Sequence, residues 1–175
     1  MAEDKPVLEY VKVEGPDVFF YCDVSVESVA ELCTTVKKVE REYHYETIVR
    51  VHIHSDGGDL HAGLAAMDFL KSCKSHVVTI AEGICASAAT FIFLGGDSRI
   101  VSRNAYLLIH QLGSEFWGKY EDMKDEMVQC NRLMKHMKRI YLRETNLPEE
   151  KLDKMMKRDM YLSYKKCVKY GIHLE

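Results

Sequence analysis

The first 110 residues alternate between short β-rich runs and longer runs with helical periodicity, and this alternation limits the fold more than any other feature of the chain. Strand-like runs occupy residues 7–13, 18–21, 47–54, 76–81, 99–101 and 106–110. Two intervening segments place apolar residues three or four positions apart, as on one face of a helix. These positions are Val29, Leu32, Val36 and Val39, followed by Leu60, Leu64, Met67 and Leu70. Because strand–helix–strand units form right-handed parallel pairs, the pattern predicts an α/β fold with a largely parallel sheet.

The C-terminal half begins with a long amphipathic segment, which we expect to be a helix over approximately residues 117–143. Its apolar positions alternate four and three apart, and they are Met123, Met127, Cys130, Met134, Met137 and Tyr141. Such a narrow stripe is typical of a helix that packs against another helix. The stripe fits self-association as well as packing within the same domain, and the pattern alone leaves both interpretations open. Shorter helices are expected after Pro148 and over residues 163–170.

Length and composition predict a single domain over residues 1–175. The chain is 47% hydrophobic and 29% charged, with three prolines and no Gly/Ser-rich linker. Its net charge of -3 argues against a nucleic-acid partner. No apolar run has the length of a signal peptide or a membrane span, so no membrane association is expected. Six scattered cysteines without a CxxC pair favour free thiols and a cytoplasmic location.

Three places carry candidate chemistry. Gly57 and Gly58 end a strand where a helix begins, so their N–H groups can face an anion, although the pair by itself favours a glycine-rich turn with no catalytic role. Ser87 lies among small residues between a strand and a helix, where it is either a helix cap or a nucleophile with the N–H of Ala88 beside it. His110 closes an apolar strand and becomes a general base if it meets Ser87. A carboxylate must then hold its other nitrogen, and periodicity does not choose among the acidic residues.

Four sequence blocks resemble the proteolytic subunit of the Clp protease. HSDGGDLHAGLAAMDFLKS is similar to its SPGG-x-V-x-x-G segment, and GICASAATFIFLGG is similar to its G-x-A-A-S-M-G segment. LLIHQ resembles its M-I-H-Q motif, and KRDMYLSYKKCVKYGI resembles its R-D-x-F-L-[ST]-x-x-E-A-x-x-Y-G segment. The blocks follow the family's order at nearly its spacing, from Ile48 to Ile172. Each block is weakly diagnostic, but the set is specific.

The resemblance implies a serine endopeptidase with the ClpP/crotonase-like fold. It assigns Ser87 as the nucleophile, His110 as the base and Asp159 as the carboxylate that orients the histidine. It assigns the oxyanion hole to backbone N–H groups of the glycine pair, Gly57 and Gly58, and of Ala88. The long helix over residues 117–143 corresponds to the family's protruding handle helix. The resemblance also implies stacked heptameric rings, peptide or unfolded-protein substrates, and no cofactor in this chain, since ATP would act only through a partner AAA+ unfoldase.

The sequence departs from the family pattern at several points. Asp56 replaces the proline of SPGG, Ala88 replaces the methionine after the nucleophile, and Leu112 stands where a proline follows the histidine motif. Backbone donors do not depend on these side chains. The first 45 residues match poorly, and they include the region that docks the unfoldase in the family, so the sequence leaves that partnership open. The spellings SDGGD and ASAAT resemble those of divergent Clp-like proteases carried by bacteriophages, some of which act in capsid maturation, and this resemblance suggests a phage member of the family.

Three other hypotheses compete with the serine peptidase. His52, His54 and Asp56 spell H-x-H-x-D at a strand end, which fits a metal-dependent hydrolase, because alternation puts both histidines on one face of the strand. A crotonase-type acyl-CoA enzyme would share the sheet and the oxyanion hole but would not need a serine, a histidine and an aspartate together. A catalytically silent ring subunit would keep the fold without the activity.

Overall fold

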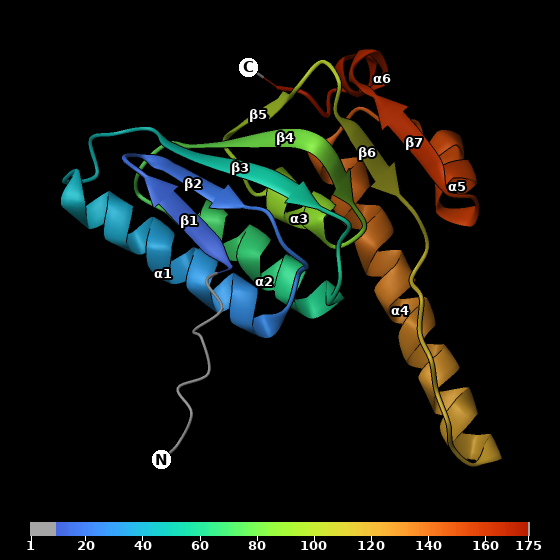
Figure 1. Cartoon of the computed structure of the whole chain (residues 1–175). Helices are drawn as coiled ribbons and strands as arrows, with labels where there is room; N and C mark the ends of the chain where they lie inside the picture. The colour runs from blue at the N-terminus through green and yellow to red at the C-terminus, as the bar shows by residue number, and fades with distance from the viewer. Residues whose placement is uncertain (1–9, 175) are drawn as a thin grey trace, which may run out of the picture.

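The computed structural model describes residues 10–174 and contains one mixed sheet of seven strands (Figure 1). The strands are β1 (Val11–Glu14), β2 (Asp17–Phe20), β3 (Val49–Ser55), β4 (Val77–Ala86), β5 (Ser98–Val101), β6 (Tyr106–Ile109) and β7 (Met160–Ser163). The helices are α1 (Val26–Glu42), α2 (Leu60–Lys71), α3 (Ala89–Leu94), α4 (Tyr120–Glu144), α5 (Glu149–Lys157) and α6 (Tyr164–Lys169). The strand order is β1-β2-β3-β4-β6-β7, with β5 also paired to β4.

The predicted parallel sheet is confirmed for its central strands. Strands β2, β3 and β4 are parallel, and β4 pairs in parallel with β5 along its first half and with β6 at its end. Antiparallel pairs close both edges, β1 with β2 and β6 with β7. The first residues of the strand predicted over 7–13 lie outside the described part of the chain.

Two strand predictions need correction. The strand expected over residues 76–81 continues to Ala86, because its last residues pair with β6 after the register shifts between Ile53 and Ser55 on β3. Strand β7 was not predicted, since four residues between two helical segments carry little periodic signal of their own. Its pairing with β6 brings the C-terminal segment beside the residue that follows β6, which is His110.

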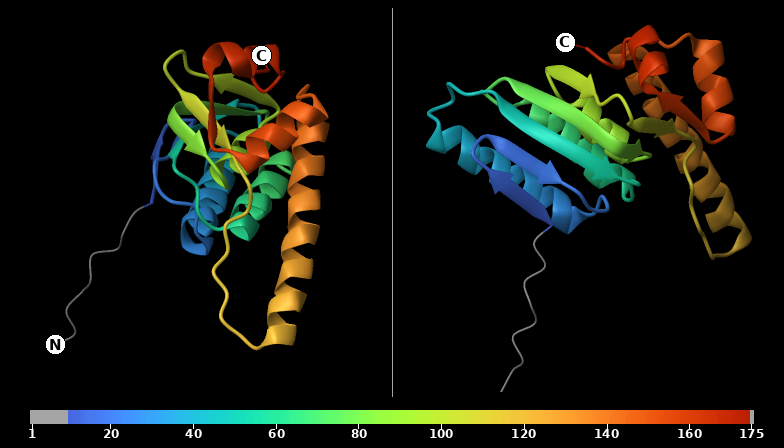
Figure 2. Two further views of the ribbon diagram at one scale, coloured as in Figure 1. Left: turned by 90° about the vertical axis from the view of Figure 1, so that its right-hand side faces the viewer. Right: turned by 45° about the horizontal axis from the view of Figure 1, so that its top comes forward.

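Helices α1, α2 and α3 cover one face of the sheet, as the two views of Figure 2 show. Alternate residues of β3 are buried towards these helices, whereas Arg50, His52 and His54 point to the other face. The four predicted core positions of α1 are all buried. Its N-cap is Ser25, whose side chain accepts a hydrogen bond from the N–H of Ser28. On α2, Met67 and Leu70 are buried as predicted, but Leu60 and Leu64 are only partly buried, because the small residues Ala62, Gly63 and Ala66 form the rest of the buried face.

Helix α4 extends from the body, and the chain before it runs back along the helix (Figures 1 and 2). The predicted apolar stripe divides into two parts. Met137 and Tyr141, near the body, are buried, whereas Met123 and Met127, near the far end, are 47% and 62% exposed. The inner part of the stripe is thus core, and the outer part lies open in the protomer. No helix within residues 10–174 has the length and apolar character needed to cross a bilayer.

Candidate active site

Ser87 occupies a tight turn between the end of β4 and the start of α3. Its φ is 53°, a left-handed conformation that residues with a Cβ rarely adopt. The turn is anchored because the Ser87 N–H donates to the Leu108 carbonyl on β6 at 2.9 Å. A strained residue held by its surroundings is typical of a functional position.

The glycine pair lies directly against this serine. A Cβ placed on Gly57 would come within 2.6 Å of the Ser87 Cβ and 3.1 Å of the Ala88 nitrogen, so only glycine allows the two turns to approach this closely. Gly57 has a φ of 105°, and its N–H donates to the Ser55 Oγ at 3.2 Å. That N–H is engaged in this structure, and the absence of a side chain at Gly57 allows the close approach of the two turns.

Two backbone N–H groups in this region have no acceptor among the residues that the structure describes. They belong to Gly58, which bridges to Val24 beyond the end of β3, and to Ala88, which begins the turn into α3. Both residues line one cleft together with Ser87 and His110. Unpaired N–H groups on either side of a nucleophile are the arrangement that stabilises an oxyanion.

His110 and Asp159 lie one residue beyond the last pair of the β6–β7 ladder. The last residue pair of that ladder is Ile109 with Met160, so the same register continued by one residue sets His110 opposite Asp159. His110 is half-buried and lines the cleft, whereas Asp159 is exposed. Within residues 10–174, no side-chain hydrogen bond joins Ser87, His110 and Asp159. Catalytic hydrogen bonds are often long in the absence of substrate.

The cleft has a volume of about 340 Å³ and an apolar wall next to the serine. This wall consists of Leu60, Phe91 and Met137, which come from α2, α3 and α4. Side chains from three helices therefore converge beside Ser87, and an apolar group of a bound molecule could contact them.

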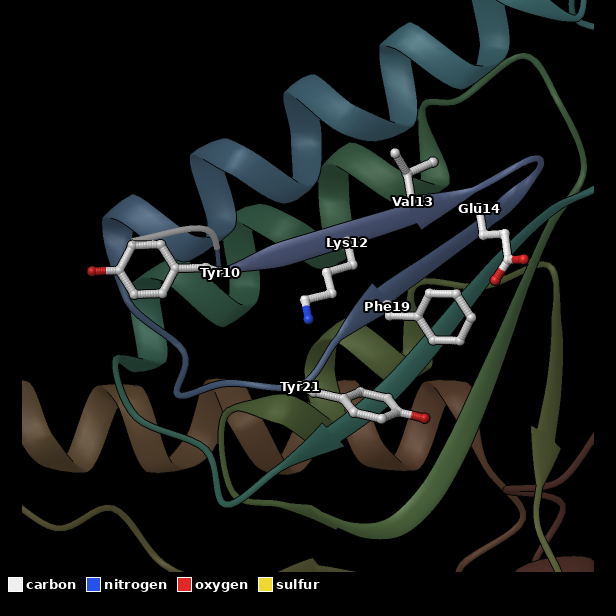
Figure 3. Close-up of a pocket in the computed structure, with 6 residues that line it drawn as sticks. All are labelled: Tyr10, Lys12, Val13, Glu14, Phe19 and Tyr21. Carbon is white, nitrogen blue, oxygen red and sulfur yellow. The ribbon is translucent and has the colours of Figure 1, made fainter. Parts of the chain in front are cut away.

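Two larger hollows contain none of the candidate catalytic residues. One lies over β1 and β2 and is lined by Tyr10, Phe19 and Tyr21 with charged neighbours (Figure 3). The other lies between α4 and the chain segment before it, and Phe116 and Met127 line it. The first hollow shares no lining residue with the cleft, whereas the second adjoins it, because Gln111 and Leu112 line both.

The histidines of the H-x-H-x-D motif lie on the open face of the sheet. His52 lies between two carboxylates, 2.9 Å from Asp17 and 3.1 Å from Glu82, and its ring stacks on Phe19 at 4.6 Å. A forked hydrogen bond from Arg50 to Asp17 lowers the pKa of that carboxyl to about 2. Among residues 10–174, no group of three His, Cys, Asp or Glu side chains is arranged to hold a metal ion.

Three residues that support the glycine turn and the start of α2 were not identified from the sequence. Ser55 accepts the Gly57 N–H, Val24 donates its N–H to the Gly57 carbonyl at 2.7 Å, and Asp59 caps α2 by accepting from Ala62 at 2.7 Å. Only the cap has a local signal, an aspartate immediately before a helical run. The contacts of Ser55 and Val24 depend on the folded turn.

The chain is similar to known proteins over most of its described length. The sequence profile of the Clp protease family matches residues 11–173. The ATP-dependent Clp protease proteolytic subunit of Deinococcus radiodurans is 32% identical over 129 residues, which cover 73% of this chain and 63% of the relative. The proteolytic subunit 2 of Borreliella burgdorferi is 34% identical over 127 residues, 71% of this chain and 64% of the relative. The matched part thus spans less than two thirds of these relatives' own length.

A third relative gives a similar result. The ATP-dependent Clp protease proteolytic subunit of Chlorella vulgaris is 32% identical over 124 residues, 70% of this chain and 62% of the relative. The family profile spans every described strand and helix, from the start of β1 to beyond α6. This chain therefore belongs to the Clp protease family.

Proposed function

We propose that this protein is a serine endopeptidase in which Ser87 is the nucleophile, His110 the general base and Asp159 the orienting carboxylate. The observation that carries the proposal is the strained Ser87 turn, flanked by the unpaired N–H groups of Gly58 and Ala88 in one cleft with His110. A merely structural serine turn does not require two backbone donors without acceptors in the same cleft.

The proposed reaction needs only these groups and water. Ser87 Oγ attacks the carbonyl carbon of the peptide bond while His110 takes the hydroxyl proton. The carbonyl oxygen becomes an oxyanion and accepts hydrogen bonds from the N–H groups of Gly58 and Ala88. The carbon–nitrogen bond then breaks, and His110 gives its proton to the leaving amine. Water repeats the sequence on the acyl-enzyme and releases the carboxylic acid.

The role of Asp159 rests on the β6–β7 register. A carboxylate opposite His110 can accept a hydrogen bond from the ring nitrogen that faces away from Ser87, which selects the useful tautomer and stabilises the imidazolium. Because Asp159 is exposed, its hydrogen bond to His110 would form when substrate binds or when the protomers assemble.

Labelling and turnover test the proposal together. A fluorescent fluorophosphonate should label Ser87 with or without a metal chelator, whereas loss of activity in chelator without labelling would support the metal hypothesis. Ser87→Ala and His110→Ala should each abolish nearly all peptide hydrolysis, and the double variant should be hardly worse than either. Asp159→Asn should remain folded but turn over slowly. Wild-type turnover in Asp159→Asn would assign the orienting role to another carboxylate, and activity in Ser87→Ala would exclude the serine mechanism.

We also propose that the protein assembles into stacked heptameric rings through α4. Support comes from the open outer part of its stripe, with Met123 and Met127 exposed beside Phe116 and Trp117, which are 47% and 98% exposed. The relatives are named as subunits, which agrees with an oligomer. Enclosed chambers would restrict substrates to peptides and unfolded proteins. Light scattering should find a particle far above the 20.2 kDa protomer, and a stable monomer would refute the ring.

A partner AAA+ unfoldase is a further part of this proposal. The relatives are named as ATP-dependent, and the aromatic hollow over β1 and β2 is an accessible surface remote from the cleft (Figure 3). ATP would act only through that partner, in the cytoplasm of a bacterial or phage-infected cell. Hydrolysis of short peptides without ATP, with protein hydrolysis only after an unfoldase and ATP are added, would support the partnership.

A further inference from the structure

A buried chain of hydrogen bonds links the turn at Ser87 to helix α4. Thr90 Oγ1 lies 2.6 Å from the Ser87 carbonyl oxygen and 2.6 Å from the Tyr141 hydroxyl. Thr90 and Tyr141 are each only 1% exposed. The ring of Phe91 packs on that of Tyr141, with centroids 5.1 Å apart, so the tyrosine is held in place by contacts besides its hydroxyl.

The direction of each hydrogen bond follows from the number of protons available. A carbonyl oxygen only accepts, so the single hydroxyl proton of Thr90 must be donated to Ser87. The Tyr141 hydroxyl must then donate to Thr90 Oγ1. Burial raises the pKa of Tyr141, which keeps its proton available for this bond at neutral pH. The Thr90 N–H also donates to the same Ser87 carbonyl, at 3.0 Å.

The geometry of the peptide group gives this chain a consequence for catalysis. The Ser87 carbonyl and the Ala88 N–H belong to one planar trans peptide, so they point in opposite directions. Two hydrogen bonds from Thr90 hold the carbonyl towards the protein interior. The Ala88 N–H is thereby directed away from the interior, and Ala88 lines the cleft. Rotation of this peptide would break both bonds and leave a buried carbonyl without a donor.

We infer that Thr90 and Tyr141 are positioning residues, which hold the Ser87–Ala88 peptide in the orientation that presents the Ala88 N–H to the reacting carbonyl oxygen. The inference rests on the proposed serine mechanism. The hydrogen-bond chain ends at Tyr141 on α4, and we propose that the far end of the same helix carries the ring contacts. One helix would then connect the ring contacts with the geometry of the oxyanion hole.

Three single variants separate positioning from packing. Thr90→Val keeps the shape but removes the hydroxyl, Tyr141→Phe keeps the ring, and Thr90→Ser keeps the donor. Thr90→Val should lower kcat for a fluorogenic peptide about 10-fold or more, short of the roughly 10²–10³-fold loss that follows removal of a whole oxyanion donor. The Michaelis constant should change little, because the oxyanion forms only in the transition state. Thr90→Ser should restore kcat to near the wild-type value, and Tyr141→Phe should lose less than Thr90→Val.

Two further measurements report on the oxyanion hole itself. A peptide boronate, which forms a tetrahedral adduct with serine, should bind Thr90→Val more weakly in proportion to the lost kcat/KM. The double variant Thr90→Val, Tyr141→Phe should be no slower than Thr90→Val alone, because the tyrosine acts through the threonine. Circular dichroism and particle sizing of every variant identify any loss of fold or assembly.

The outcomes distinguish this inference from the proposed function. If Ser87→Ala is inactive but folded Thr90→Val keeps wild-type kcat and boronate affinity, the positioning role is wrong and the serine mechanism stands. If the losses in Thr90→Val and Tyr141→Phe multiply in the double variant, the two residues act separately and the chain is refuted. If Ser87→Ala remains active, the serine mechanism and this inference both fail.

Discussion

Substitution of Gly57 by alanine tests the close approach on which the cleft depends. The added Cβ would lie 2.6 Å from the Ser87 Cβ and 2.8 Å from the Ala86 carbonyl oxygen. Carbon atoms normally approach no closer than about 3.5 Å, so roughly 1 Å must be gained by moving the glycine turn, the serine turn or both. Neither contact is to the flexible end of a long side chain. The strain therefore displaces the nucleophile or the neighbouring Gly58 donor.

The expected loss of turnover follows from that displacement. A misplacement of about 1 Å at a reacting group costs on the order of 10²-fold in rate, which corresponds to about 2.7 kcal/mol. The φ of 105° at Gly57 adds backbone strain of about 1–3 kcal/mol for any residue with a Cβ. We expect kcat for a fluorogenic peptide to fall at least about 10²-fold, with a lower free energy of unfolding but a retained fold.

Gly15→Ala provides a control for a side chain added at a positive φ without a steric clash. Gly15 also has a positive φ, 57°, but its added Cβ would meet only the Tyr43 hydroxyl at an ordinary 3.6 Å, in a turn remote from the cleft. This variant should lose about 1 kcal/mol of stability and keep wild-type turnover. Urea unfolding and peptide turnover of both variants, with Ser87→Ala as the inactive reference, complete the assay. Folded Gly57→Ala with turnover within about threefold of wild type would refute the reasoning.

Three further predictions concern assembly and stability. Met127→Glu should shift light scattering towards smaller particles, because a charge is costly in an apolar interface. The circular dichroism of the protomer should not change, because this side chain is 62% exposed before assembly. A particle of unchanged size would show that Met127 on α4 does not take part in the ring contacts. Asp17→Asn should lower the free energy of unfolding by about 1 kcal/mol or less at neutral pH, since the Arg50 pair is partly exposed. Folding lowers the pKa of Asp17 from 3.8 to about 2, so its stabilisation is present above about pH 4 and is lost as the pH falls towards 2. The free energies of unfolding of the wild type and of Asp17→Asn, measured with urea, should therefore converge near pH 2. Glu40→Ala should cost about 2–3 kcal/mol in the same assay, because the buried carboxylate accepts the N–H groups of Lys74 and Ser75 at 2.7 and 2.9 Å; a loss below about 0.5 kcal/mol would mean that water replaces it.

Much of the architecture was predictable because it is encoded between near neighbours in the chain. The apolar spacing of α1 identified its buried face and that of α2 identified half of its predicted positions, since helical periodicity needs only residues three and four apart. The alternation of strand and helix predicted the parallel centre of the sheet. Four motif blocks, read as a family resemblance, gave the candidate residues Ser87, His110 and Asp159, and two of these line one cleft.

Other features depend on residues that are distant in sequence. Strand β7 and the last residues of β4 are strands because both pair with β6. No pattern within either segment predicts that pairing. The stripe of α4 has one sequence pattern but two environments, since only its inner half reaches the body. Periodicity specifies a face of a helix, whereas burial depends on what the folded chain places against it.

In the candidate site, too, some features follow from the sequence and others only from the tertiary structure. The sequence by itself determined that a serine, a histidine and a glycine pair would end neighbouring strands of an α/β sheet. Only the tertiary structure decided that the Gly57 N–H donates to Ser55 whereas the Gly58 N–H has no acceptor within residues 10–174. It likewise joined Thr90 to Tyr141 across 51 residues. Hydrogen-bond partners are chosen by distances of a few tenths of an ångström, which arise only when separate segments pack together.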